Sequence, residues 1–85
     1  MSTGPAPLLG TPSAAASGYI VVYRDGTDPD AVTDALAAAH GFAPTHVFRH
    51  ALLGFSAALS DDALEAVRRH PDVKYVEHDG PVGIS

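Results

Sequence analysis

The sequence has 85 residues, which is enough for one domain but near the lower end of what a single apolar core can keep folded. It contains no cysteine, so disulfides and thiolate metal sites are excluded. The net charge of −5, with only five Lys and Arg, argues against binding to nucleic acid or to anionic membranes, and no apolar run is long enough to span a bilayer.

Residues 1–17 are rich in Pro, Gly, Ser and Ala and show no periodicity, which predicts a flexible leader. Leu8 and Leu9 alone are weak evidence for docking. The leader lacks a basic start and a long apolar centre, so it is not an intact secretory signal. We therefore expect either a cytoplasmic protein or a secreted one whose signal is absent from this sequence.

Residues 18–24 are β-branched and aromatic and predict a strand. Both alternate sets of its side chains are apolar, so we expect it in the middle of a sheet. A helix is predicted over residues 29–40, because Asp28 can cap its start, Pro29 suits its first position and Gly41 suits the position after its end. Its expected buried stripe is Val32, Ala35, Leu36 and Ala39.

Pro44 introduces a second strand, expected over residues 45–51. A short turn over residues 52–54 then leads to a third strand at residues 55–59, and these two strands are expected to form a hairpin. A second helix begins after Ser60, an N-cap residue, and ends before His70 and Pro71. Its expected buried stripe is Ala63, Leu64 and Val67, with Glu65 paired to Arg68 and Arg69 on the solvent side. The last strand is expected over residues 73–78.

The order β-α-β-β-α-β predicts an α+β, ferredoxin-like fold, with a four-stranded antiparallel sheet and both helices on one face. Two short helices cannot cover both faces of a sheet, so we expect the other face to meet water or a partner. Ser56 and Ala58 are small and are expected to keep that face flat. A flat face suits another protein better than a small molecule.

Three segments occur in a characteristic order and spacing: YIVVYRDG at residues 19–26, GFSAALS at residues 54–60 and PDVKYVEHD at residues 71–79. Together they resemble the inhibitor I9 family, which includes the propeptides of subtilisin-like serine proteases and some stand-alone inhibitors. The resemblance implies an inhibitor domain over residues 18–79. It also implies a subtilisin-like serine protease as the partner, in cis or in trans, and a chaperone role for the domain within a precursor.

The resemblance implies two kinds of contact with the protease. Glu77 and Asp79 match an acidic pair that accepts hydrogen bonds from the N-termini of two protease helices. The alternative is that these two residues simply form a solvated strand end. The tail over residues 80–85 would lie in the substrate groove as an added strand. It consists of Gly80, Pro81, Val82, Gly83, Ile84 and Ser85. If Ser85 is the natural end, it takes the first subsite and Val82 the fourth, but serine is smaller than the residue that many propeptides have there.

Catalytic, metal and cofactor functions are not predicted. No Gly-x-Ser-x-Gly motif is present, and Ser56 has no base fixed beside it. His46 and His50 lie on a predicted strand, about 13 Å apart at about 3.3 Å per residue, which is too far for shared metal binding. Arg24 and Arg49 also lie in predicted strands, whereas an acylphosphatase-like enzyme needs an arginine in a glycine-rich loop.

The alternative function is a ferredoxin-like module that binds a small ligand or dimerises, without inhibitor activity, since this fold carries many functions. For the inhibitor we expect a monomer when free. A propeptide would be secreted, and a stand-alone inhibitor would be cytoplasmic.

Overall fold

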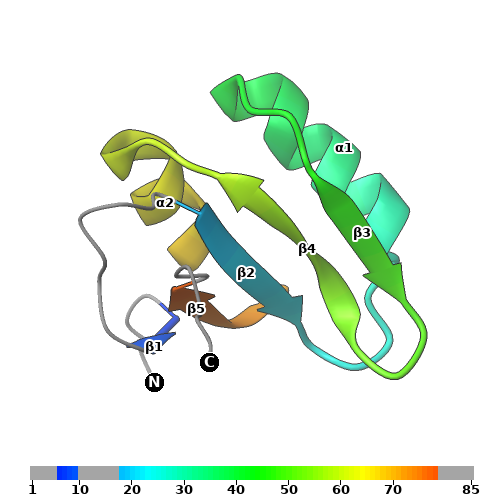
Figure 1. The fold of residues 1–85 in the computed structure, drawn as a ribbon. Helices are drawn as coiled ribbons and strands as arrows, with labels where there is room; N and C mark the ends of the chain where they lie inside the picture. The colour runs from blue at the N-terminus through cyan, green and yellow to red at the C-terminus, as the bar shows by residue number, and fades with distance from the viewer. Residues whose placement is uncertain (1–5, 10–17, 79–85) are drawn as a thin grey trace, which may run out of the picture.

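The computed structural model describes residues 6–9 and 18–78, and these form one α+β fold. The elements in chain order are β1 (Leu8–Leu9), β2 (Gly18–Tyr23), α1 (Pro29–His40), β3 (His46–Arg49), β4 (Leu53–Ala58), α2 (Asp61–Arg68) and β5 (Val73–His78). The strands form one sheet in the order β1-β5-β2-β4-β3. Both helices lie on the same side of this sheet (Figure 1). The predicted class and the central position of β2 are therefore confirmed.

The sheet differs from the prediction at one edge. It has five strands instead of four and is mixed, because β1 runs parallel to β5. The extra strand comes from the predicted leader, where the carbonyl of Pro7 accepts a 2.9 Å hydrogen bond from the amide of Val76. A strand of two residues has no periodicity that a sequence can display, so only the pairing with β5 reveals it.

The hairpin of β3 and β4 is confirmed, but its turn lies earlier than predicted. β3 ends at Arg49 and β4 already begins at Leu53, so Gly54 belongs to the strand and not to the turn. Gly54 lies opposite Val22 of β2, and a Cβ at this position would overlap with the carbonyl oxygen of Val21. A glycine here thus permits close approach of two strands. In the sequence alone, the same glycine looks like a turn signal.

The helix ends follow the predicted caps. The Asp28 carboxylate accepts hydrogen bonds from the amides of Asp30 and Ala31 at 3.1 and 3.2 Å, and Gly41 ends α1 with a φ of 73°. The Ser60 hydroxyl accepts from the Ala63 amide at 3.2 Å. These short-range interactions fix both helix starts, and the bounds of α1 are those predicted.

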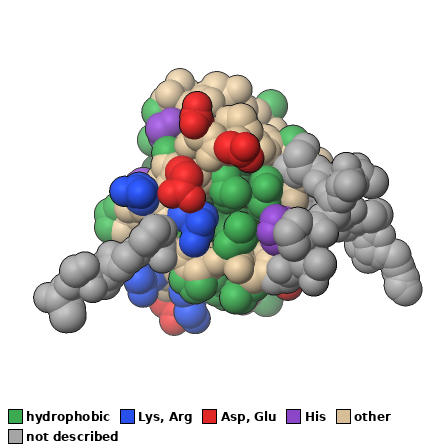
Figure 2. Space-filling model, turned by 90° about the vertical axis from the view of Figure 1, so that its left-hand side faces the viewer, with side chains coloured by type: hydrophobic (Ala, Val, Ile, Leu, Met, Phe, Trp, Pro, Cys, Tyr) green, Lys and Arg blue, Asp and Glu red, His purple; other side chains and the backbone are tan. Residues whose placement is uncertain are grey.

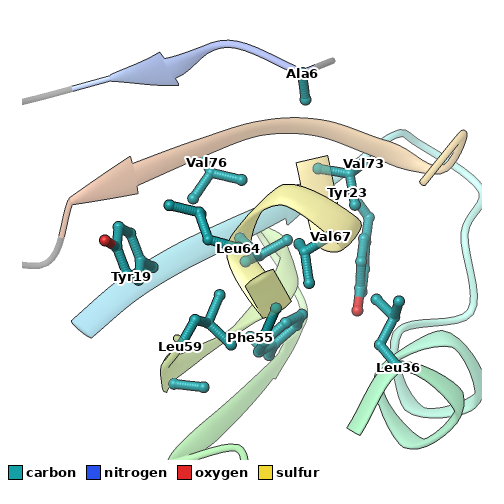
Figure 3. Packing of buried hydrophobic residues seen from close by; sticks show 13 residues of the cluster. Ala6, Tyr19, Tyr23, Leu36, Phe55, Leu59, Leu64, Val67, Val73 and Val76 are labelled. Atoms are coloured by element: carbon teal, nitrogen blue, oxygen red, sulfur yellow. The ribbon is translucent and has the colours of Figure 1, made fainter. Parts of the chain in front are cut away.

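The core lies between the helices and the sheet. Val21 of β2, Phe55 of β4 and Val76 of β5 lie opposite one another on the helix side and are completely buried. Val67 of α2 is also completely buried and lies near Tyr23 in the close-up (Figure 3). The predicted stripe of α2 is confirmed in full: Ala63, Leu64 and Val67 are all buried.

The predicted stripe of α1 is partly wrong. Leu36 is buried, but Ala35 and Ala39 are exposed, and the second buried residue is Thr33. The Thr33 hydroxyl lies 2.7 Å from the hydroxyl of Tyr23. The helix therefore turns a polar residue inward, because a tyrosine hydroxyl on β2 supplies the partner that a buried hydroxyl needs.

Candidate functional site

The side of the sheet away from the helices is a continuous surface that crosses all five strands. One row of mutually opposite residues begins at β1 and ends at β3: Leu9, Glu77, Ile20, Ser56 and His46. A second row consists of Tyr75, Val22, Gly54 and Phe48, and Ala58 lies opposite Gly18 in a third. We call these eleven residues the open face.

The centre of the open face has small side chains. β4 contributes Gly54, Ser56 and Ala58, so no side chain of this strand rises far above the backbone. Ser56 is 7% exposed beneath its neighbours, whereas Ala58 is exposed. The structure thus places Ser56 and Ala58 together on the uncovered face, and the flat centre follows from residue size.

The surroundings of this centre are apolar. Ile20, Phe48 and Tyr75 are half-buried, and Val22 is 4% exposed. Beside Val22 and Tyr75 the surface opens into a pocket of about 300 Å³, whose rim includes His50, Leu52 and Lys74. The open face is therefore flat over β4 but hollowed toward the β3–β4 turn.

Glu77 brings a negative charge into the first row. It is exposed and lies between Leu9 and Ile20. Among the described residues, the ion pairs are Arg49 with Asp30 at 2.8 Å, and Arg68 and Arg69 with Glu65 at 3.1 and 3.6 Å. None of these pairs uses the carboxylate of Glu77, which can therefore accept hydrogen bonds from a partner. Asp79 and residues 80–85, the other predicted contacts, lie outside the described residues.

His46 and His50 are not brought together for metal binding, and only His46 lies in a strand. His46 lies in the first row of the open face, whereas His50 lines the pocket. Across residues 6–9 and 18–78, no three His, Cys, Asp or Glu side chains are grouped as a metal site requires. Within the same ranges, no helix has the length and apolar character of a membrane span.

The arginines considered for a phosphate-binding enzyme have structural contacts. Arg24 follows β2 and donates its Nε hydrogen to the carbonyl of Pro71 at 3.0 Å. Arg49 ends β3 and binds the carboxylate of Asp30 through Nε and a terminal nitrogen. The Arg49 hydrogen bonds hold the pKa of Asp30 below its ordinary value. Both side chains therefore join neighbouring elements.

Three of the open-face residues are predicted from the sequence as contacts with a protease: Ser56 and Ala58 on the sheet face and Glu77 as a helix cap. The alternation within β2 and β5 suggests that Ile20 and Val22 share one face, as do Tyr75 and Glu77. It does not say which face the helices leave uncovered. Leu9 had only a weak signal in the sequence, because its place depends on the pairing of β1 with β5.

Comparison with known proteins supplies the family. Residues 18–85 match the peptidase inhibitor I9 family. The chain is 35% identical over 82 residues to proteinase R of Parengyodontium album and 37% identical over 84 residues to a cuticle-degrading protease of Metarhizium anisopliae, covering 95% of this chain and 21% of each relative. A subtilisin-like serine protease of Sarocladium strictum is 36% identical over 67 residues, 79% of this chain and 17% of that relative.

The chain thus spans about a fifth of the length of these relatives. The matched region includes β2 to β5 and therefore all of the open face except Leu9. The family match, at the positions where the three sequence segments predict it, leads to one conclusion: the chain belongs to the peptidase inhibitor I9 family.

Proposed function

We propose that this I9 domain inhibits a subtilisin-like serine protease by docking its open face on the protease and placing residues 80–85 in the substrate groove. The observation that carries the proposal is the uncovered, flat and largely apolar sheet face in a chain of an inhibitor family. Removal of such an apolar face from water lowers the free energy of the system and therefore favours binding. Ser56 and Ala58 permit close approach of that partner.

Glu77 and Asp79 would orient the docked domain. A helix N-terminus on the protease offers amides without intrahelical partners and a partial positive charge. A carboxylate at the end of β5 can accept hydrogen bonds from such amides. The exposure of Glu77 and its place beside the apolar row support this role.

Inhibition itself needs no chemistry from this chain. An I9 domain is an inhibitor domain and not a catalytic one. Residues 80–85 would add as an extended strand to the groove, where main-chain hydrogen bonds give affinity and side-chain subsites give selectivity. With Ser85 at the first subsite, Val82 would take the fourth.

The relatives suggest that the domain acts in cis. Their names describe proteases, and each is about five times as long as the region matched here. In such a precursor, a domain that binds the native protease but not its unfolded chain shifts the folding equilibrium by mass action. We expect that precursor to be secreted. A stand-alone inhibitor would instead act in trans, in the cytoplasm, and would be a folded monomer before it binds.

The test is a titration of the chain into subtilisin with a chromogenic peptide substrate. A second chain that ends at Asp79 serves as the comparison, and circular dichroism verifies that both are folded. We expect inhibition by the full chain and a loss of at least about a hundredfold in affinity for the shortened one, because the groove contacts are removed.

One outcome of this titration would contradict the proposal. A folded full chain that fails to inhibit several subtilisin-like proteases at roughly tens of micromolar, which excludes binding stronger than about 6 kcal/mol, contradicts the proposal. Sedimentation of that chain as a dimer would then favour the alternative of a dimerising module that pairs through the open face.

A further inference from the structure

The N-terminal strand β1 enlarges the surface that we assign to the protease. Leu9 lies directly opposite Glu77 in the parallel pair of β1 and β5, so its side chain is on the open face. Leu8 is on the other side of the sheet and packs against the core. Leu9 is 44% exposed, one of two large hydrophobic residues that the described part of the chain leaves exposed.

The segment that carries Leu9 is fixed to two elements. The Ala6 amide donates to the carbonyl of Arg68 at 2.7 Å, and Arg68 Nε donates back to the carbonyl of Ala6 at 2.8 Å. Val76 of β5 donates to the carbonyl of Pro7 at 2.9 Å. Ala6 itself is buried at the end of α2 and beside β5 (Figure 3). Leu9 thus follows three residues whose positions are set by the domain.

The neighbours of Leu9 in its row, Glu77 and then Ile20, favour a partner at this edge that is partly apolar. On the side of the molecule that carries β1 and α2, hydrophobic side chains are visible between acidic and basic ones (Figure 2). A leucine beside Glu77 can exclude water from any hydrogen bonds that this carboxylate makes in a complex. Such an arrangement strengthens a charge-assisted hydrogen bond, because the bond then lies in a medium of lower dielectric constant.

We propose that Leu9 contacts the protease directly, next to the helix N-terminus that Glu77 caps, so that the docking surface spans five strands and not four. This inference rests on the proposed inhibitor function. The group that contacts Leu9 is an apolar side chain of the same protease, because the row of Leu9, Glu77 and Ile20 is continuous with the rest of the open face. The N-terminal segment is then part of the inhibitor and not merely a leader before it.

The experiment measures binding of the full chain and its variants to a subtilisin whose catalytic serine is replaced by alanine, so that the inhibitor is not cut. We expect Leu9→Ala to weaken binding about fivefold to thirtyfold, the effect of removing a leucine side chain from an interface. Leu9→Asp should weaken it further, since it would bury a carboxylate against the apolar side chain that Leu9 contacts. Thermal unfolding of the free Leu9→Ala chain should match that of the wild type.

The matched control is Leu8→Ala, the adjacent residue on the core side of the same strand. It should lower the melting temperature and leave the affinity of the folded chain within about twofold of the wild type, because it is absent from the docking surface. The inference is overturned if the wild type binds the protease and Leu9→Ala and Leu9→Asp bind equally well. It is also overturned if Leu8→Ala and Leu9→Ala lower affinity alike. Absence of binding by the folded wild type would instead refute the proposed function.

Discussion

Tyr23 and Thr33 form the polar contact that joins β2 to α1. Their hydroxyl oxygens are 2.7 Å apart, and both residues are buried, Thr33 completely. Burial raises the pKa of Tyr23 to about 12; the hydrogen bond to Thr33 lowers it and the charge of Asp72 raises it, each by less. The aromatic ring meanwhile packs 5.9 Å from that of Phe55. One side chain thus combines core packing with a satisfied buried hydrogen bond.

The raised pKa of Tyr23 predicts a loss of stability in alkali. Below pH 10 the hydroxyl is protonated in both states, and its contribution is fully present. Between pH 10 and about 12 only the unfolded chain ionises, so the free energy of unfolding should fall by about 1.4 kcal/mol per pH unit from this group.

Urea denaturation at several values between pH 8 and pH 12 measures this effect. Other groups titrate in the same range, so the comparison is with Tyr23→Phe, which should show a shallower decline. Equal slopes for the two chains would show that Tyr23 titrates normally in the folded protein.

Gly54 predicts a second effect at the residue scale. Gly54→Ala should lower the free energy of unfolding by about 3 kcal/mol, because the new Cβ overlaps with the carbonyl oxygen of Val21 and forces β2 and β4 apart. Gly41→Ala is the matched control. Apart from adjacent backbone, no atom would lie within 4 Å of a Cβ at this position, and only the backbone conformation at a φ of 73° costs free energy, about 1 kcal/mol. Similar costs for both would contradict the close approach.

At the scale of elements, β1 and β5 form the least expected pair. β5 would otherwise be an edge strand with free backbone groups, and such an edge can pair with other chains. Residues 6–9 cover it in parallel and also bind the end of α2 through Arg68. This arrangement protects the strand that carries Glu77.

Deletion of residues 1–9 should therefore destabilise the domain and promote self-association. We expect a loss of about 1–2 kcal/mol, since hydrogen bonds worth about 1 kcal/mol each are offset in part by the chain entropy of residues 6–9. Thermal unfolding and sedimentation measure the two effects. Deletion of residues 1–5 is the control, because it keeps Ala6–Leu9, and it should behave as the full chain. A monomer of unchanged stability after deletion of residues 1–9 would show that β1 contributes nothing to the domain.

At the scale of the whole molecule, the division between the two faces of the sheet is the main feature. Both helices cover one face, and the core lies between the helices and the sheet. It contains only a few large side chains, and Phe55 is one that is completely buried. The opposite face carries no helix in the described part of the chain (Figure 1). A domain of this size has a modest core, so a partner on the open face would add to its stability by mass action.

Ala58→Arg tests the docking of this face. Ala58 is exposed, so the domain should remain folded, but the long charged side chain should weaken inhibition of subtilisin at least about tenfold by preventing close approach. Ala35→Arg places the same side chain on the exposed side of α1 and should inhibit as the wild type. Equal inhibition by both variants would exclude the open face as the docking surface.

Glu77→Gln tests the electrostatic part of the same contact. The amide keeps the shape of the side chain but loses the charge, so we expect about tenfold weaker binding and a smaller dependence of affinity on salt. Asp34→Asn removes one charge from an exposed position on α1 and corrects for the change in net charge. If both variants bind alike, Glu77 makes no specific contact with the protease.

The sequence by itself determined the parts that depend on neighbouring residues. Asp28 and Ser60 cap the helices, Gly41 ends the first one, and the apolar periodicities give the order of the elements, because caps, turns and periodicities act over a few residues. The bounds of α1 and β5 followed from these signals. Glu77 was found by resemblance, and Ser56 and Ala58 by size, but the row that joins Glu77 to Ser56 was not predicted.

Only the tertiary structure decided which residues lie opposite one another. The choice of Thr33 over Ala35 as a buried residue depends on the hydroxyl of Tyr23, ten positions away. The row that joins Leu9 to Glu77 depends on a pairing between the two ends of the chain. Such pairings are selected by hydrogen bonds and packing between distant segments, and a local pattern contains no information about them.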